Sequence, residues 1–438
     1  MAGLAALERA MPAKSSSRSR RSQGREAGTS GTGGPVGGGA NPPSRGQEAE
    51  ANPALPDAMP PRFVGQRLRR KEDLRLVSGR GRYVGDIHLP GMLHAAILRS
   101  PVAHARITSI DVSAARGVRG VAAVVTAADL SGKVGPFVEG ARLEISPQLM
   151  EKVGPVVKPL PMPVLADGSV FWAGQPVAAV LAESRYIAED ALETIKVDYE
   201  PLPVVVNPEE AVSPGAPVIH ASLGDNVAAS FVVESGDAEA ALSGAAHVFT
   251  GRFKVGRQAS NAMETRGVVA SFDRGRGDLS VWCTNARPHL VRTYISQMMG
   301  MLADQIRVIS PDMGGSFGTG MFSEDILVPF LATSSGRPVK WVEDRSENLA
   351  NTRHGRDLVH YVEVGYGDDG RIVALKDKFL VDCGAYNPYA ITVSYNCAAH
   401  LRNQFDIPAV RIEAKSVLTN KAPVTPVRGA GRPEQAVA

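Results

Sequence analysis

Two stretches of the chain carry apolar residues at the spacings of strands and helices, and together they predict an α+β fold. In the first, residues 62–212, the alternating run "MLHAAILRS" predicts a strand that ends at Ser100-Pro101. The continuous apolar run "PVAAVLAE" is typical of a buried strand, and Ser184 directly after it is placed to cap a helix. The apolar face of that helix is predicted to contain Ile187, Ala191 and Ile195.

The second stretch, residues 227–438, follows a polar, turn-rich linker at 213–226. It is predicted to open with the strand "AAHVFTGRFKVG", and a stripe at helical spacing then predicts a helix. The stripe consists of Leu290, Tyr294 and Met298. "QIRVIS" predicts a strand, and after the glycine-rich "PDMGGSFGTG" a helix is expected from about Ser323 to Thr333, stopping near Gly336.

One glycine motif in the second stretch matches a nucleotide-binding pattern in spacing but not in context. "GYGDDG" has the spacing of a dinucleotide-binding loop, but an alternating run follows it where that motif requires a helix N-terminus. Asp369-Gly370 lies between two such runs, which predicts a β-hairpin turn instead.

Composition distinguishes an N-terminal tail from the rest of the chain and argues against several classes of protein. Residues 1–60 contain no Phe, Tyr or Trp and are rich in Gly, Ser, Pro and Arg, so we expect them to be disordered. The net charge of +3 comes largely from this segment and aromatic residues make up only 5%, which argues against a nucleic-acid partner. No apolar run has the ~18 residues of a membrane span. The three widely spaced cysteines form no CxxC pair, which argues against a metal cluster or a disulfide scaffold and favours the reducing cytoplasm.

Three short segments are candidates for chemistry. In "PDMGGSFGTG", Gly314, Gly315 and Gly318 let backbone N–H groups approach an anion or cofactor, although the motif taken alone favours a glycine-rich turn between strand and helix. "PVRGAGRPE" places Arg428 among small residues, where it can hold an oxyanion or simply belong to a basic surface loop. In "NAMETRG", Glu264 stands beside Arg266, and the plainest interpretation is a salt-bridged strand end.

Taken in order, "RPHLVR", "PDMGGSFG", "GRPVKWVEDRSEN", "DCGAY" and "PVRGAGRPE" resemble the molybdopterin-binding large subunit of the xanthine dehydrogenase/aldehyde oxidase family. Upstream, "GQRLRRKEDLRLVSGRGRYVGDIHLPGMLHAAILRSPVAHARI" and "GQPVAAVLAESRYIAEDALETIKVDYEPLP" are similar to its N-terminal a/b hammerhead domain. The resemblance implies a hammerhead domain at 62–212 and a first molybdenum-cofactor-binding domain at 227–438.

The same resemblance implies a molybdenum hydroxylase that oxidises an aldehyde or an aromatic heterocycle with water as the oxygen source. The cofactor would be molybdopterin, in its cytosine dinucleotide form, with the metal held by the pterin and by no protein ligand. Electrons would leave through a 2Fe-2S small subunit to an FAD medium subunit, because this chain carries neither cluster cysteines nor a flavin motif.

Carried over by motif, the cofactor-binding residues are those of the glycine-rich loop together with two small residues near the C-terminus, and Arg428 is the catalytic candidate on the substrate side of the metal. The cofactor-binding set is Gly314, Gly315, Ser316, Phe317, Gly318, Gly429 and Ala430.

Several positions depart from the family pattern. Gly429 stands where carbon monoxide dehydrogenases carry a copper-binding cysteine, and Met321 stands where purine-oxidising members carry a glutamate, so neither substrate is expected. Ser316 replaces a glycine that is usual in the loop. Ala286 replaces a glutamine that contacts the metal centre, a task left to Asn285 or Arg287.

The resemblance also implies that a second half of the large subunit, with its glutamate base, lies outside these residues. We therefore expect a fragment, a truncated product, or a half-subunit completed by another chain. The alternative to a hydroxylase subunit is a truncated, non-catalytic scaffold that docks the redox subunits.

Overall fold

A computed structural model describes residues 63–137, 156–318, 320–351, 354–389 and 391–438 of the chain. The predicted tail, residues 1–60, lies outside the described residues. The chain divides into two units, Pro12–Gly81 and the remainder, and the first contributes residues 63–81 to the description. In that segment the short helix α2 (Asp73–Val77) buries none of its residues.

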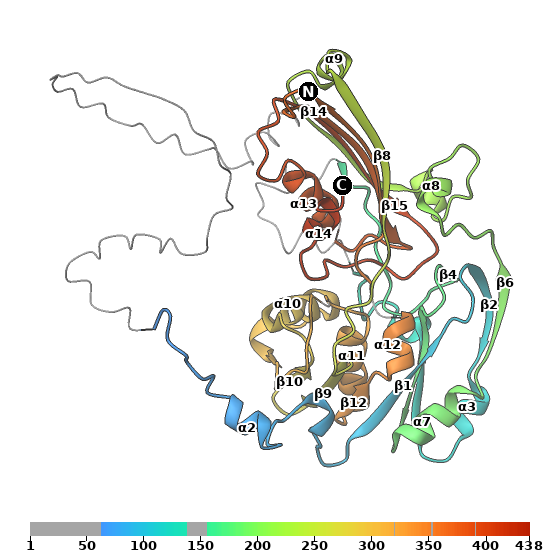
Figure 1. The fold of residues 1–438 in the computed structure, drawn as a ribbon. Coiled ribbons are helices and arrows are strands. Elements are labelled where there is room, and N and C mark those ends of the chain that lie inside the picture. The colour runs from blue at the N-terminus through green and yellow to red at the C-terminus, as the bar shows by residue number, and fades with distance from the viewer. Residues whose placement is uncertain (1–62, 138–155, 319, 352–353, 390) are drawn as a thin grey trace, which may run out of the picture. The chain divides into compact units, whose positions relative to one another are not determined.

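A seven-stranded sheet carries most of the elements around the glycine-rich loop (Figure 1). Its strand order is β11-β10-β9-β12-β1-β5-β3. The strands are β1 (Leu93–Arg99), β3 (Val121–Thr126), β5 (Pro176–Ala182), β9 (Gly267–Asp273), β10 (Asp278–Cys283), β11 (Ile306–Ile309) and β12 (Val339–Val342). Its helices are α7 (Arg185–Leu192), α10 (Pro288–Met299), α11 (Glu324–Ser335) and α12 (Arg345–Asn351). The short helices α3 (Ser113–Gly117) and α4 (Ala127–Leu130) flank β3.

This sheet combines strands from both predicted domains, because β1 pairs in parallel with β12, with Leu93 opposite Val339. Every residue of β5 is buried, which explains its uniformly apolar sequence. Helix α11 is buried along almost its whole length, so it lacks a polar face. The predicted domain boundaries stay a prediction.

A five-stranded sheet with the order β7-β15-β14-β13-β8 carries the C-terminal part of the chain. Its strands are β7 (Val227–Ser235), β8 (His247–Val255), β13 (Leu358–Tyr366), β14 (Ile372–Gly384) and β15 (Ala409–Leu418). Helices α13 (Thr392–His400) and α14 (Arg432–Gln435) lie side by side, and α13 packs on β15 (Figure 1). Helices α8 (Pro208–Ala211) and α9 (Ala238–Ser243) also contact this sheet.

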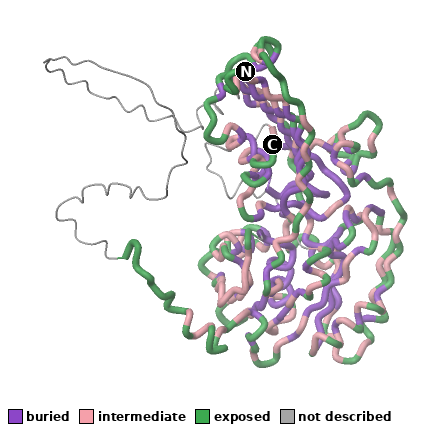
Figure 2. Tube along the Cα trace, viewed as in Figure 1, coloured by how far each residue is buried: buried purple, intermediate pink, exposed green. Residues whose placement is uncertain are grey.

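The remaining strands form a small sheet, β4-β2-β6, from β2 (Ala105–Asp111), β4 (Ser169–Val170) and β6 (Lys196–Pro201). Single 3-10 turns lie at Val84–Asp86, Ala221–Leu223 and Ala303–Gln305. Buried residues concentrate on the strands of the two large sheets, whereas loops and outer helix faces are exposed (Figure 2).

Most of the predicted elements are confirmed. The predicted first strand is β1, which ends at Arg99, and Ser184 caps α7 by accepting a hydrogen bond from the Ile187 N–H at 3.2 Å. Gly336, at φ 68°, closes α11, and the predicted hairpin joins β13 to β14 with Gly370 at φ 78°.

Two predictions of local structure are wrong. Helix α7 ends at Leu192, so Ile195 lies beyond it, and its buried residues are Ala188 and Ala191. The second stretch opens with β7 and α9 rather than with β8, and β7 forms the edge of the five-stranded sheet beside β15.

Candidate functional site

The two segments singled out for cofactor binding meet in the structure. The glycine-rich loop (residues 312–318) connects β11 to α11, and the arginine loop (residues 426–431) connects β15 to α14. The Arg428 N–H donates to the Phe317 carbonyl oxygen at 2.8 Å. A Cβ added to Gly318 would lie 2.5 Å from the carbonyl oxygen of Pro426, so only glycine permits this approach. Two segments far apart in sequence thus form one continuous surface.

Both loops hold their backbones in left-handed conformations. Phe317 (φ 54°) and Ala430 (φ 48°) are not glycines, so each adopts a conformation that an L-residue rarely occupies. Such residues persist only where the surroundings fix them, and they concentrate at functional sites. The left-handed glycines of the two loops are Gly315 (φ 118°), Gly318 (φ 97°), Gly429 (φ 98°) and Gly431 (φ 100°).

Glu264 fixes the start of the glycine-rich loop. Its carboxylate accepts a hydrogen bond from the Gly314 N–H at 2.7 Å, and its own N–H donates to the Gly314 carbonyl oxygen at 3.3 Å. A Cβ on Gly314 would come within 2.5 Å of the Glu264 Cβ. Burial raises the pKa of Glu264, and the nearby Asp86 and Asp312 carboxylates add to the increase, against the lowering effect of its backbone hydrogen bonds.

The predicted pairing of Glu264 with Arg266 is therefore wrong. Arg266 is buried and pairs instead with Glu324, at 2.9 Å, and with Glu343. Its guanidinium group also lies over the Phe322 ring, 3.8 Å from the centroid. Since Phe322 and Glu324 follow the glycine-rich loop, this arginine holds the loop's exit while Glu264 holds its entry.

A second arginine completes the buried network. Arg99 of β1 pairs with Glu324 at 2.8 Å and with Glu347 at 2.8 Å. Burial alone would raise the pKa of Glu324, but Arg266 and then Arg99 outweigh it and lower that pKa to about 2. The carboxylate is therefore ionised at neutral pH. No sequence pattern indicated this network, because its five members come from five separate segments of the chain.

The guanidinium group of Arg428 has no partner among the described residues. The residue is exposed, and no described residue takes a hydrogen bond or an ion pair from its guanidinium group. Its backbone, by contrast, is fixed by the bond to Phe317. The arrangement leaves an exposed guanidinium group, carried on a fixed stretch of backbone, available to an anion or to a developing negative charge.

The substitutes suggested for Ala286 have other contacts. Asn285 is buried, its side-chain oxygen accepts the Arg287 N–H at 3.0 Å, and its carbonyl oxygen accepts a hydrogen bond from Ser310. The side-chain oxygen of Asn285 therefore stabilises the start of α10. Met321 is also buried, in the main hydrophobic core beside α11.

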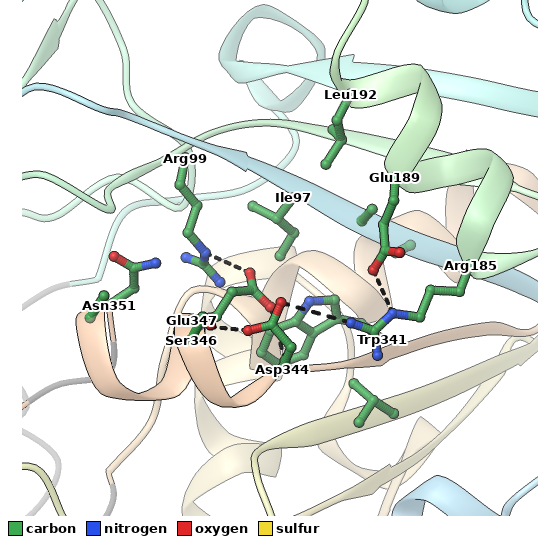
Figure 3. A pocket seen from close by; sticks show the side chains of 14 residues that line it. Ile97, Arg99, Arg185, Glu189, Leu192, Trp341, Asp344, Ser346, Glu347 and Asn351 are labelled. Atoms are coloured by element: carbon green, nitrogen blue, oxygen red, sulfur yellow. Dashed lines mark hydrogen bonds and ion pairs between the residues drawn. The ribbon is translucent and has the colours of Figure 1, made fainter.

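A cavity of about 420 Å³ lies elsewhere, between α7, β1, β12 and α12 (Figure 3). Its charged side chains are paired with one another: Arg185 with Glu189 and Asp344, and Arg99 with Glu347. Neither loop contributes to its lining. Within the described part of the chain, no group of three or more His, Cys, Asp or Glu side chains could hold a metal ion.

The two loops form a glycine-rich surface in a fold that combines a seven-stranded and a five-stranded sheet, and two family models match this fold. The Molybdopterin cofactor-binding domain matches residues 219–438, and the a/b hammerhead domain of aldehyde oxidase and xanthine dehydrogenase matches residues 78–203. The chain belongs to the xanthine dehydrogenase/aldehyde oxidase family, and is similar to its molybdopterin-binding large subunits.

Individual relatives support this assignment. The chain is 37% identical over 374 residues to the nicotine 6-hydroxylase large subunit of Paenarthrobacter nicotinovorans, covering 84% of this chain and 44% of that one. It is 36% identical over 394 residues to the carbon monoxide dehydrogenase large chain of Hydrogenophaga pseudoflava, covering 86% and 46%. The crystal structure of quinoline 2-oxidoreductase from Pseudomonas putida 86 matches with a TM-score of 0.78 and 36% identity, covering 83% and 45%.

The chain thus spans less than half the length of these relatives. A different proportion holds for the nicotinate dehydrogenase large molybdopterin subunit of Eubacterium barkeri, at 28% identity: the match covers 85% of this chain and 83% of that subunit. In the described residues, no helix is long and apolar enough to cross a membrane.

Proposed function

We propose that the chain is the molybdopterin-binding part of a molybdenum hydroxylase that oxidises an aldehyde or an aromatic heterocycle, with water as the oxygen source. The observation that carries this proposal is the contact between the glycine-rich loop and the arginine loop. Their surface combines backbone groups that lack Cβ atoms with a guanidinium group that has no described partner. These features fit a bulky anionic cofactor beside a small substrate.

The chain's own residues would act in two ways. Backbone N–H groups around Gly314, Gly315 and Gly318 would contact the cofactor, for which we propose the cytosine dinucleotide form of molybdopterin. Arg428 would orient the substrate and stabilise negative charge that develops on it. When bound, the molybdenum cofactor would supply the oxidation chemistry itself.

The substrate class rests on two positions and on the relatives. Gly429 has no thiol with which to bind copper, and a side chain there would collide with Pro433, since an added Cβ would lie 2.5 Å from that ring. We therefore propose that carbon monoxide is not the substrate. Met321 is buried and apolar, which disfavours a purine held by a carboxylate. Relatives named for nicotine and quinoline point instead to aromatic heterocycles.

We further propose that a second molybdopterin-binding segment completes the site and supplies a glutamate base. The support is that the match covers only 44% of the nicotine 6-hydroxylase large subunit and 46% of the carbon monoxide dehydrogenase large chain. A 2Fe-2S small subunit and an FAD medium subunit would accept the electrons. The three buried, unpaired cysteines suit the reducing cytoplasm as the place of assembly.

The test is to purify the complex that contains this chain and to measure molybdenum and the released pterin nucleotide. Dye reduction is then followed with a panel of aldehydes and N-heterocycles, and 18O-labelled water reports the origin of the oxygen. The proposal predicts about one molybdenum per chain and label in the product. A complex that forms with its redox subunits but holds no molybdenum would contradict it, and would support the non-catalytic scaffold instead.

A further inference from the structure

The arginine loop is held by a buried ion pair. Arg356 follows α12 and precedes β13, and its Nη1 lies 3.1 Å from Glu434 Oε1 of α14. Arg356 is 9% exposed to solvent and Glu434 is 1% exposed, so the pair is shielded from water.

Each member of the pair also binds the loop backbone directly. Arg356 donates to the carbonyl oxygen of Val427 at 3.4 Å and to that of Arg428. The second carboxylate oxygen of Glu434 accepts the Gly431 N–H at 3.1 Å. The turn from Arg428 to Gly431 is therefore tied at its first carbonyl and at its last N–H by two side chains that bind each other.

This turn needs such ties because its conformation is unfavourable. Gly429, Ala430 and Gly431 all have positive φ, and Ala430 is not a glycine. A Cβ on Gly431 would lie 2.5 Å from the Val393 carbonyl oxygen, so the turn also packs closely on α13. Replacing a buried ion pair with apolar residues is often neutral for stability, so stability alone does not account for placing one here.

We infer that Arg356 and Glu434 are positioning residues for Arg428, holding its backbone so that the guanidinium group projects from a fixed turn. The inference deepens the proposed function and rests on it for the role of Arg428. The turn's geometry can be tested independently of any cofactor. Neither residue is expected to touch cofactor or substrate, because the side chains are buried on the inner side of the loop.

Amide hydrogen exchange tests whether the ion pair fixes the turn. It is measured in the full chain, on peptides that cover residues 426–432. The variants are Arg356→Met, Arg356→Lys and the milder Glu434→Gln. The control is Arg411→Met, which also removes an arginine with two carboxylate partners, but whose partners, Glu234 and Glu413, lie outside both loops. We expect exchange in these peptides to rise at least tenfold in all three variants, Lys included, because one ammonium group cannot reach both Glu434 and the Arg428 carbonyl oxygen.

Three results would overturn the inference: unchanged exchange in Arg356→Met, equal acceleration in Arg411→Met, or full protection restored by Arg356→Lys. In the assembled complex, the electron paramagnetic resonance spectrum of the partly reduced, Mo(V) state should shift in Glu434→Gln, and an unshifted spectrum counts against a positioning role. A wild-type complex without molybdenum would overturn the proposed function alone, since the exchange result still decides whether the pair fixes the turn.

Discussion

The main-chain N–H of Arg428 donates to the carbonyl oxygen of Phe317 at 2.8 Å, and both residues stand in loops with left-handed backbone. This bond couples the candidate catalytic arginine to the candidate cofactor loop. Because Gly318 packs against the Pro426 carbonyl oxygen beside it, neither loop can move without disturbing the other. The loops are therefore expected to respond to substitution as one unit.

Gly318→Ala tests whether the glycine-rich loop and the arginine loop respond to substitution together. The new Cβ would both occupy a left-handed conformation and overlap the Pro426 carbonyl oxygen. We expect a loss of about 2–4 kcal/mol in the apparent free energy of unfolding, of which about 1–2 kcal/mol comes from the backbone conformation. Gly91→Ala is the matched control, because Gly91 has φ 69° and nothing within 4 Å of the added Cβ. Urea denaturation that gave equal losses for the two variants would show that the loops do not pack as described.

Arg428→Met should separate function from stability. The side chain is exposed and no described residue binds it, so we expect a change within about 0.5 kcal/mol in the free energy of unfolding. Turnover of the assembled complex should fall by about 100-fold or more, as is typical when a group that stabilises developing charge is removed. Arg292→Met, an exposed arginine on α10, serves as the control and should keep wild-type turnover. An Arg428→Met enzyme with unchanged turnover would rule out the assigned role.

Glu324→Gln should alter the pH dependence of stability. The folded pKa of about 2 lies below the unfolded value, so the stabilisation is complete above the unfolded pKa, roughly 4.3, and is lost as pH falls toward 2. At pH 7 the variant should be less stable by about 3–5 kcal/mol, because Arg266 and Arg99 lose a charged partner. Unfolding followed in urea should show this gap narrowing by roughly 1 kcal/mol at pH 3.5. A gap that stays constant between pH 7 and pH 3.5 would contradict the assigned ionisation.

Ionisation of Glu264 should change the free energy of unfolding with pH in the opposite direction to that of Glu324. Its pKa is raised, so ionisation opposes folding, and its contribution to stability improves as pH falls through the folded pKa. Glu264→Gln keeps an oxygen acceptor for the Gly314 N–H and should be at least as stable as wild type at pH 7. Glu264→Ala removes the acceptor and should cost about 1 kcal/mol. Thermal melting that ranked the glutamine variant below the alanine variant would refute the assigned hydrogen bond.

Local structure could be predicted wherever one segment determines it. The buried strand β5, the Ser184 cap and the Gly336 helix end follow from residue type and spacing over a few positions. Helix α7 was predicted too long because Ile195, although apolar and buried, belongs to the connection after it.

The contacts that build the site could not be predicted in this way. Glu264 precedes Arg266 by two residues, yet it binds Gly314, while Arg266 enters the core where Glu324 and Glu343 converge. The partner of a long charged side chain depends on tertiary packing rather than on its sequence neighbours. The individual binding roles of the loop residues stay predictions.

The most direct test of the central claim is a density map of the cofactor-loaded complex. We expect the pterin and the metal to lie against the backbone of residues 314–318, with Arg428 on the substrate side of the metal. Cofactor density that contacts neither the glycine-rich loop nor the arginine loop would contradict it.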